Sequence, residues 1–348
     1  MSTRMILRIV AIAVLVVALI YQCTNKAEAA PLRVLYVTQS AGFQHAPVKP
    51  GADGVAPSEA AMIAIGKDSG AFTAQIAQSA AEVTPERLKS IDVLVFYTTG
   101  VLPIPGTTWT AVQDWVASGK GGFVGLHSAT DTGWPYEGAR DSYTRFIGGK
   151  FAGHPWTQGT PVRFATHDPD HPTVAMWGPS IDYAEEIYQY SDYDPVRVRV
   201  LQSLDFSGTP LKRPYAVPVT WVRQIGKGRL FYTNIGHTPS TWDDPRYRTQ
   251  IVEGIKWAAG LTKGEATPDP KRQALWQIRS LLAFGGTPAA EIDALVGRLA
   301  KAEDRWLSDI ARRIASQRNG FPAGNADRTA FDRTYAALVA EVRAKAGA

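Results

Sequence analysis

The stretch GGFVGLHSATD, residues 121–131, contains a short apolar run that ends directly on His127 and continues into a small polar turn. Apolar runs of this length are typical of strands that are buried on both faces of a parallel sheet. Ligands of open α/β sheets bind beyond the carboxyl ends of such strands. A histidine at that end of the strand is therefore a candidate for a functional site.

The segments before this stretch alternate between strand and helix patterns. Strands are predicted at residues 32–39 (LRVLYVTQ) and 91–99 (IDVLVFYTT), and helices at residues 58–68 (SEAAMIAIGKD) and 107–119 (TTWTAVQDWVASG). Strands that alternate with helices form a right-handed, doubly wound sheet. We therefore predict an α/β fold with a mostly parallel sheet and helices on both faces.

The middle of the chain is richer in predicted strands. They are PVRFATH (161–167), EEIYQY (185–190), VRVRVLQSLD (196–205), AVPVTWVRQ (216–224) and RLFYTNIG (229–236). We expect them to extend the sheet with antiparallel members. A helix capped by Asp244 and ending near Gly260 then closes the domain.

The first 29 residues have the features of a secretory signal peptide. Arg4 and Arg8 precede an apolar run from Ile9 to Ile20, and small residues stand at the cleavage spacing before Ala30. The alternative is a retained membrane anchor, although a spanning helix needs about 20 apolar residues. A lipid on Cys23 is a further alternative, and Gln22 does not fit its signal. We predict cleavage after residue 29 and a periplasmic protein.

The chain changes character near residue 262. TKGEATPDPK (262–271) is typical of a linker, and beyond it apolar residues recur at helical spacing. We therefore divide the chain into a signal peptide (1–29), an α/β domain (30–262) and a C-terminal region of three helices (263–348). That region holds no histidine and mixed charges, so we expect it to pack on the α/β domain or mediate self-association, without contributing a catalytic group.

Composition excludes several functions. Cys23 is the only cysteine, so a chain cleaved after residue 29 has no disulfide, no thiolate metal site and no cysteine nucleophile. Cleavage lowers the formal net charge from +5 to +3, and no dense basic run occurs. We therefore expect no nucleic-acid partner.

The histidines are confined to the predicted α/β domain. Three follow predicted strands (His45, His127 and His237), and His154 lies on a glycine-flanked loop that can approach the same edge. The remaining two, His167 and His171, have the surroundings of turn residues. A lone histidine at a strand end is usually structural, but four at compatible positions favour a site.

Several motifs together resemble one known family. They are TQSAGFQH (38–45), GLHSATDT (125–132), IGGKFAGHP (147–155), EEIY (185–188) and PVTWVRQIGKGRLFYTNIGHTPSTWDDPRY (218–247). In this order they resemble the ThuA-like (trehalose utilisation) family over roughly residues 32–260. The resemblance implies a flavodoxin-like, class I glutamine amidotransferase-like fold, in which the strand ending at His127 is similar to the one that delivers a cysteine nucleophile. This chain has no cysteine there, so it is not a cysteine-dependent amidotransferase.

The resemblance also implies a set of site residues: His45, His127, Asp131, His154, Glu186, His237 and Trp242. Imidazoles and a carboxylate can bind a divalent metal such as zinc, or exchange protons near neutral pH. We expect catalytic roles for His127, His237, Asp131 and Glu186, and metal ligation by His45, His127 and His237. Asp131 could orient the His127 ring through its second nitrogen, or alternatively cap a turn.

Two further expectations concern neighbours of these residues. Alternation along EEIY places Glu185 and Glu186 on opposite faces, so one carboxylate faces inward and the other stays solvated; we favour Glu186 as the inward one. For substrate binding we expect His154 and aromatic platforms for sugar rings, from Trp134, Trp156 and Trp242.

The family is associated with the use of disaccharides through 3-keto-sugar intermediates. The resemblance therefore implies an exported carbohydrate-processing protein, a hydrolase, lyase or isomerase that uses a divalent metal or histidine acid–base chemistry on a small sugar. No nucleotide is expected. The alternative is a non-catalytic sugar-binding or scaffold protein with the same fold.

Overall fold

The computed structural model describes residues 30–136, 138–321 and 328–347. The predicted signal peptide at residues 1–29 lies outside these residues, and its cleavage stays a prediction. Within the described residues, no helix is both long and apolar enough to cross a membrane.

Strands and helices alternate through the first part of the fold and then give way to a series of strands. The main elements are β1 (Leu32–Val37), α2 (Pro57–Ser69), β3 (Phe72–Ala77), α3 (Pro85–Leu88), β4 (Val93–Phe96), α4 (Gly106–Ala117), β6 (Gly122–Leu126), α5 (Ala139–Ile147), β9 (Pro161–Thr166), β10 (Ser180–Ala184), β12 (Arg199–Leu204), β13 (Pro218–Ile225), β14 (Gly228–Thr233) and α6 (Pro245–Ala258). The predicted strand that ends before His127 is confirmed as β6, and the predicted helices at 58–68 and 107–119 are confirmed as α2 and α4.

In the described residues, nine strands form one sheet in the order β10-β9-β12-β13-β14-β6-β4-β1-β3. Neighbours from β3 to β14 pair in parallel, and neighbours from β14 to β10 pair antiparallel. This confirms the predicted mostly parallel α/β core with an antiparallel extension.

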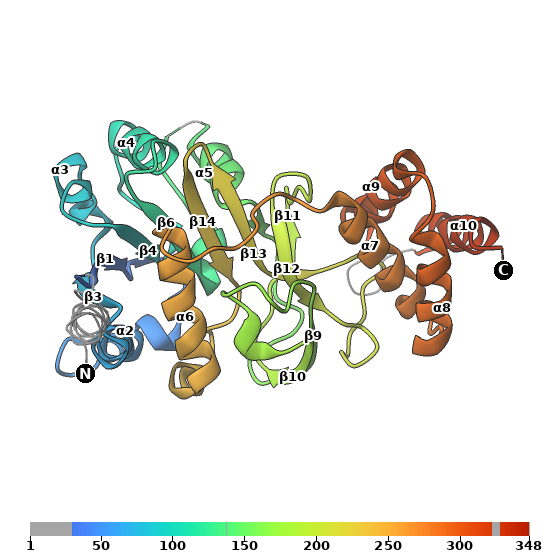
Figure 1. The fold of residues 1–348 in the computed structure, drawn as a ribbon, viewed down its shortest axis with the longest axis horizontal. Helices are drawn as coiled ribbons and strands as arrows, with labels where there is room; N and C mark the ends of the chain where they lie inside the picture. Colours follow the sequence, from blue (N-terminus) through green and yellow to red (C-terminus); the bar gives the residue numbers. More distant parts are fainter. Residues whose placement is uncertain (1–29, 137, 322–327, 348) are drawn as a thin grey trace, which may run out of the picture. The chain divides into compact units, whose positions relative to one another are not determined.

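Helices cover both faces of the sheet, as the side-chain alternation of β1 shows. Val34 and Tyr36 belong to the hydrophobic cluster that includes residues of α2 and α6, whereas Leu35 and Val37 belong to the cluster that includes residues of α4 and α5. Figure 1 shows α2 and α6 on one side of the strands and α4 and α5 on the other. A strand that is apolar at every position is what such double coverage requires.

A second, three-stranded sheet ties together the loops that leave the carboxyl ends of β1, β4 and β6. It consists of β2 (Ser40–Ala41), β5 (Thr99–Val101) and β7 (Thr132–Gly133), all parallel. Gly100 permits the close pairing, because a Cβ atom there would lie 1.6 Å from the carbonyl oxygen of Ala41. The loops that carry the candidate site residues are thus held side by side.

The strand prediction missed two edge strands and was wrong in part at a third segment. The edge strands β3 and β10 were not predicted. The predicted strand 185–190 is instead an irregular segment: Ile187 makes an isolated bridge with Trp156, and only its last residue begins the two-residue β11 (Tyr190–Ser191), which pairs with β8 (Lys150–Phe151). Its backbone N–H groups bond at alternate positions to the facing loop of residues 153–160, so no continuous ladder forms.

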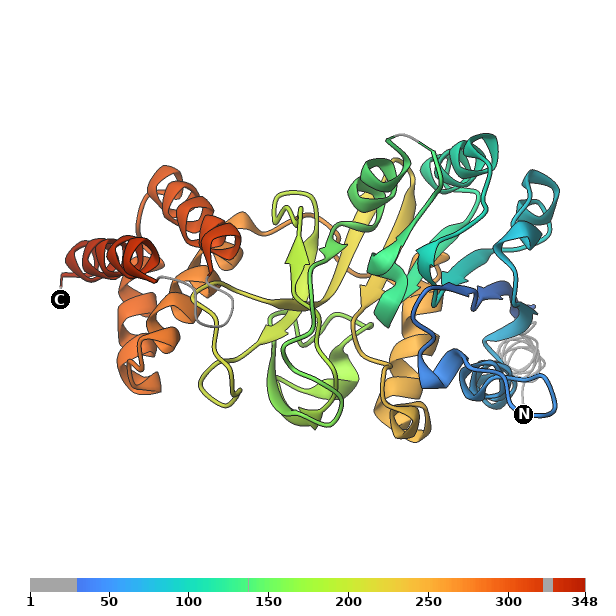
Figure 2. The ribbon, with the colours of Figure 1, turned by 180° about the vertical axis from the view of Figure 1, so that it is seen from behind.

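The C-terminal region contains four helices among the described residues rather than three. They are α7 (Pro270–Phe284), α8 (Ala289–Leu299), α9 (Asp304–Gly320) and α10 (Thr329–Lys345), coloured orange to red in both views (Figure 1, Figure 2). The proline-rich segment that was predicted as a linker runs into the start of α7, where Asp269 caps the helix. From Leu32 onward the chain forms one compact unit, so a domain boundary at 262/263 stays a prediction.

Candidate functional site

His127 lies where β6 ends and a short 3₁₀ helix (His127–Asp131) begins. Its φ angle is +42°, in the left-handed region that non-glycine residues rarely occupy. Such a backbone costs on the order of 1–3 kcal/mol and is found mostly at functional sites. The sharp turn directs the ring to the carboxyl edge of the sheet, where it is fully buried.

The hydrogen bonds of His127 fix the tautomer of its ring. Nδ1 lies 2.7 Å from the carbonyl oxygen of Asn234 at the end of β14. Because a carbonyl oxygen only accepts, Nδ1 carries a proton, and the neutral ring presents a lone pair at Nε2. Nε2 faces His237 Nδ1 at 3.2 Å and Glu186 Oε1 at 3.5 Å.

Glu186 lies between three imidazoles. Its Oε1 is 3.1 Å from His237 Nδ1, and its Oε2 is 3.2 Å from Nδ1 of His154, whose side chain is half-exposed. Burial by itself raises the pKa of Glu186, but the imidazoles of His127 and His237 outweigh this effect and hold that pKa well below its usual range. The carboxyl group is therefore ionised and faces the site.

His45 completes the group from the loop after β1. Its Nε2 lies 3.0 Å from the hydroxyl of Tyr188, and its ring makes edge-on contacts with the rings of His127 and His237. Burial, with a smaller contribution from the neighbouring imidazoles, lowers the pKa of His45 to about 2. The ring is therefore neutral at physiological pH, which is the form that binds metals.

One potential ligand atom from each of His45, His127, Glu186 and His237 lies within 4.8 Å of the other three. Among them, the atoms of His127, Glu186 and His237 form a triangle with edges of 3.1, 3.2 and 3.5 Å. Ligands at the 2.0–2.1 Å typical of zinc lie about 3.3 Å apart in a tetrahedral site. The spacing of the side chains therefore fits a divalent metal.

The proton count of this triangle points the same way. When the His127 ring is neutral, its Nε2 and Glu186 Oε1 both offer lone pairs, while His237 Nδ1 lies within reach of both and holds at most one proton. That proton satisfies one of the two acceptors and leaves the other unmatched. A bound cation would satisfy all three atoms, so these four buried side chains could hold a metal ion.

A cavity of about 220 Å³ opens beside the cluster. Its walls include His45, Glu186, His154, Asp131 and Tyr188, together with Thr99 and the aromatic rings of Phe43 and Phe151. Phe43 is 66% exposed, an unusual state for a large apolar side chain next to a polar cluster. The cavity thus combines titratable groups with apolar ring faces.

Asp131 lines the cavity, but the predicted role in orienting His127 is wrong. The nitrogen that was expected to face this carboxylate is held instead by the Asn234 carbonyl. The negative charge of Asp131 acts on Tyr188, where it adds to the effect of burial in raising the pKa of the phenol.

The three tryptophans that were predicted as sugar platforms lie in the core and do not reach the cavity. Trp134 packs on Trp109 and Tyr143, Trp156 is fully buried, and Trp242 stacks on Tyr97. A ring that is covered on both faces cannot stack on a ligand. We therefore correct this prediction: the aromatic walls are Phe43 and Phe151, which were not predicted from the sequence.

Glu185 is buried like Glu186, contrary to the prediction that one of the pair stays solvated. Its carboxylate accepts hydrogen bonds from the backbone of Gly236 and Thr238 and from the hydroxyls of Thr238 and Thr241, at 2.8–3.2 Å. These donors belong to the loop that carries His237. Glu185 thus organises the loop, and Glu186 faces the cavity.

The other two histidines lie outside the cluster. His167 Nε2 is 2.9 Å from Ser203 Oγ, and its ring packs edge-on against Trp276 of α7. His171 Nδ1 bonds to the hydroxyl of Thr173. Both have structural partners.

Three of the solved structures that are similar to this chain illustrate the likeness. A putative ThuA-like protein from Bacteroides uniformis is 22% identical with a TM-score of 0.53, over 67% of this chain and 94% of that chain. One from Parabacteroides merdae is 14% identical with a TM-score of 0.48, over 69% and 98%. A putative GMP synthase protein from Thermoplasma acidophilum is 9% identical with a TM-score of 0.40, over 67% and 96%. The first likeness shows a shared fold.

Comparison with curated proteins gives no significant match. The sequence profile of the ThuA family, described as trehalose utilisation, matches residues 33–258, which is more than half of the chain. The motifs at 38–45, 125–132 and 218–247 lie within this range and supply residues of the cluster. The chain therefore belongs to the ThuA family.

Proposed function

We propose that this protein is an exported carbohydrate-processing enzyme that acts on a keto-sugar or a disaccharide derivative, with the help of a divalent metal, zinc or a similar ion. The observation that supports the proposal is the buried group of His45, His127, Glu186 and His237 at the carboxyl edge of the sheet. Burying three imidazoles and a carboxylate together is costly unless a bound ion or proton transfer uses them.

The four side chains would hold the metal, which when bound would act as a Lewis acid and polarise a substrate carbonyl. Asn234 fixes the tautomer of His127, and Glu185 fixes the loop of His237, so both rings are preorganised. His154 is half-exposed and lies 3.2 Å from the Glu186 carboxylate. It is the residue placed to exchange a proton between a substrate in the cavity and solvent.

The size and walls of the cavity favour a sugar. Its volume of about 220 Å³ is smaller than typical pockets for drug-sized ligands and suits a single sugar ring. Phe43 and Phe151 offer apolar faces for the C–H side of such a ring, and Asp131 and Tyr188 offer partners for hydroxyl groups. A second sugar of a disaccharide would extend past the exposed ring of Phe43.

A keto group makes the neighbouring C–H bonds acidic. An imidazole takes the proton, and the electron pair of the broken C–H bond moves onto the carbonyl oxygen, giving an enediolate. Return of the proton at a different carbon gives an isomer of the sugar. Departure of a β-substituent with its electron pair completes an elimination instead. The same residues can therefore serve an isomerase or a lyase.

Metal analysis of protein purified without a histidine tag, followed by assay against 3-keto-disaccharides, tests the proposal. We expect about one equivalent of a divalent metal and turnover that stops when a chelator removes it. A protein that binds sugar but contains no metal and turns over no keto-sugar would favour the non-catalytic alternative.

Export is part of the same proposal. Cleavage after residue 29 gives a periplasmic chain that begins at Ala30, and the intact mass of protein from the periplasmic fraction measures it. A mass that retains residues 1–29, or a lipid on Cys23, would contradict a cleaved signal peptide.

A further inference from the structure

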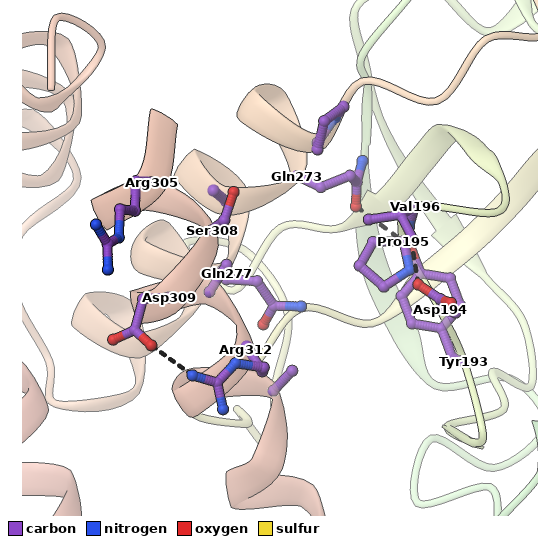
Figure 3. Close-up of a pocket in the computed structure, with 14 residues that line it drawn as sticks. Tyr193, Asp194, Pro195, Val196, Gln273, Gln277, Arg305, Ser308, Asp309 and Arg312 are labelled. Atoms are coloured by element: carbon purple, nitrogen blue, oxygen red, sulfur yellow. Dashed lines mark hydrogen bonds and ion pairs between the residues drawn. The ribbon is translucent and has the colours of Figure 1, made fainter. Parts of the chain in front are cut away.

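A second cavity lies between the loop 193–196 and helices α7 and α9. Its volume is about 600 Å³, within the range of ligand sites, and none of its lining residues lines the cavity beside the cluster (Figure 3). We propose that this cavity binds a small organic anion with an apolar body, such as an aromatic or medium-chain carboxylate.

Gln277 supplies an unsatisfied hydrogen-bond donor at this cavity. Its Oε1 accepts a hydrogen bond from the backbone N–H of Ala216 at 2.8 Å, which fixes the orientation of the amide. Its Nε2 is buried and has no hydrogen-bond partner among the described residues, although the side chain is only 1% exposed. A buried donor without a partner costs about 1–3 kcal/mol. Because Gln277 lines the cavity, an occupant that reaches its amide meets a donor that has no other partner.

The charged side chains that line the cavity carry two negative and two positive formal charges, but they differ in how they are paired. Asp194 is paired with Arg197, and Asp309 is paired with both Arg312 and Arg313. Arg305, which also lines the cavity, has no ion-pair partner in the part of the chain that the structure describes. Figure 3 marks the ion pair between Asp309 and Arg312 and draws no interaction to Arg305. The acidic groups are therefore neutralised, while one arginine stays available to an anion.

The remaining walls suit an apolar body. Pro195, Val196 and Ala274 line the cavity together with alanines of α9, and the ring of Tyr193 adds an aromatic surface. The Tyr193 hydroxyl donates to Gln273 Oε1 at 3.3 Å, so this ring is anchored to α7. An occupant would touch both the loop and the helices, and its binding would hold them together.

Calorimetric titration with 2-naphthoate, and with the neutral 2-naphthamide as the matched comparator, tests the proposal. We expect saturable binding of about one equivalent of 2-naphthoate, at least fivefold tighter than 2-naphthamide. Arg305→Gln should weaken 2-naphthoate about tenfold, as expected for loss of a charge-assisted hydrogen bond. Gln277→Glu should weaken it by at least as much, because the new carboxylate keeps the acceptor for Ala216 but repels an anion.

Lys301→Gln is the control, since it removes an exposed positive charge that does not line the cavity. It should leave the affinity for 2-naphthoate unchanged, and metal content should be unchanged in every variant. Arg305 is exposed, so its substitution should preserve the fold even if Gln277→Glu does not. Equal affinity for the acid and the amide, wild-type affinity in Arg305→Gln, or no saturable binding would each overturn the proposal.

Discussion

The cavity beside the histidine cluster is smaller than the cavity at the C-terminal helices, but it adjoins the larger group of potential metal ligands. The cavity beside the cluster has a volume of about 220 Å³, against about 600 Å³ for the one at α7 and α9. Yet the smaller cavity adjoins three histidines and a glutamate whose ligand atoms lie within 4.8 Å of one another. The larger cavity and the cluster of potential metal ligands therefore lie in different parts of this molecule.

The difference follows from how each region is built. At the cluster, strand ends and a three-stranded sheet of loops bring polar groups from distant parts of the sequence to one edge. At the tail, helices pack through leucine and isoleucine side chains, and charged side chains form ion pairs both along α9 and between helices. The histidine cluster therefore brings together nitrogen and oxygen atoms that can donate lone pairs to a cation.

The largest expected effect is on metal binding by the cluster. Glu186→Gln removes the only carboxylate of the group, and His237→Ala removes an imidazole that is about 9% exposed. Each should lower the affinity for zinc by at least about 100-fold, since loss even of a residue that only supports a ligand costs 10- to 100-fold. The Kd measured by competition with a chromophoric chelator checks this.

His167→Ala is the matched control for His237→Ala, because His167 bonds to Ser203 outside the cluster. Zinc affinity in this variant should equal that of the wild type. If all three variants bound zinc equally well, the cluster would not be a metal site and the contrast between the two regions would disappear.

The next effect concerns Glu185, which does not face the cavity. Glu185→Gln places an NH₂ group among hydrogen-bond donors of the 236–241 loop. Losing a hydrogen bond to a charged group costs about 1.5–3 kcal/mol, so the free energy of unfolding should fall by that amount. Displacement of His237 should in addition weaken zinc binding about 10- to 100-fold.

Glu59→Gln is the control that distinguishes a role of Glu185 in positioning His237 from a contribution of Glu185 to stability alone. Glu59 is a buried carboxylate that accepts from Thr38, Ala56 and Gln78, away from the cluster. It should lower the free energy of unfolding to a similar extent and leave zinc affinity unchanged. Equal zinc affinities in the two variants would show that Glu185 serves the fold alone.

The strand and helix order of the α/β core could be predicted because its signals are local. A fully apolar run such as residues 122–126 can bury both faces, and His127 follows it directly. That the same histidine is fully buried with a φ of +42° has no sequence signature. The sequence therefore predicted the position of this residue at a strand end but not its burial or its backbone conformation.

Long-range partners set the limit of the site prediction. Alternation separated Glu185 from Glu186 but could not show that a distant loop would bury Glu185. The tryptophans were misplaced because an indole in the core and an indole on a ligand have the same sequence context. Phe43 lies two residues before His45 in the loop motif TQSAGFQH. This closeness to a predicted site histidine was the available sequence signal that Phe43 lines the cavity.

A smaller effect is expected in the pH dependence of stability, at the histidines outside the cluster. Burial, with a contribution from the charge of Arg272, lowers the pKa of His167 to about 3. Unfolding restores a pKa near 6.5, so between about pH 6.5 and 3 the unfolded chain binds a proton that the folded chain refuses. Acid therefore destabilises the fold, by up to about 1.4 kcal/mol per pH unit for this site.

Urea unfolding of the metal-free protein at pH 7 and pH 5 measures this dependence. His167→Gln keeps a partner for Ser203 but does not titrate, so the decrease in unfolding free energy between the two pH values should be smaller than in the wild type. An unchanged decrease would mean that His167 has an ordinary pKa and that α7 does not cover it as the structure has it.

The smallest effect is expected for Asp131→Asn, and it tests which group holds His127. Asp131 lines the cavity, but the His127 ring is anchored at 2.7 Å by the carbonyl of Asn234, a backbone group that the substitution leaves in place. Removing a partly screened charge near a cation should lower zinc affinity by about fivefold or less. Sugar binding, for which Asp131 offers an acceptor in the cavity, should weaken more than zinc binding does.

If Asp131→Asn lost zinc as completely as Glu186→Gln, the carboxylate would be a ligand or the true support of the ring. The cluster would then extend along the cavity wall, and its metal chemistry would reach the solvent-facing side.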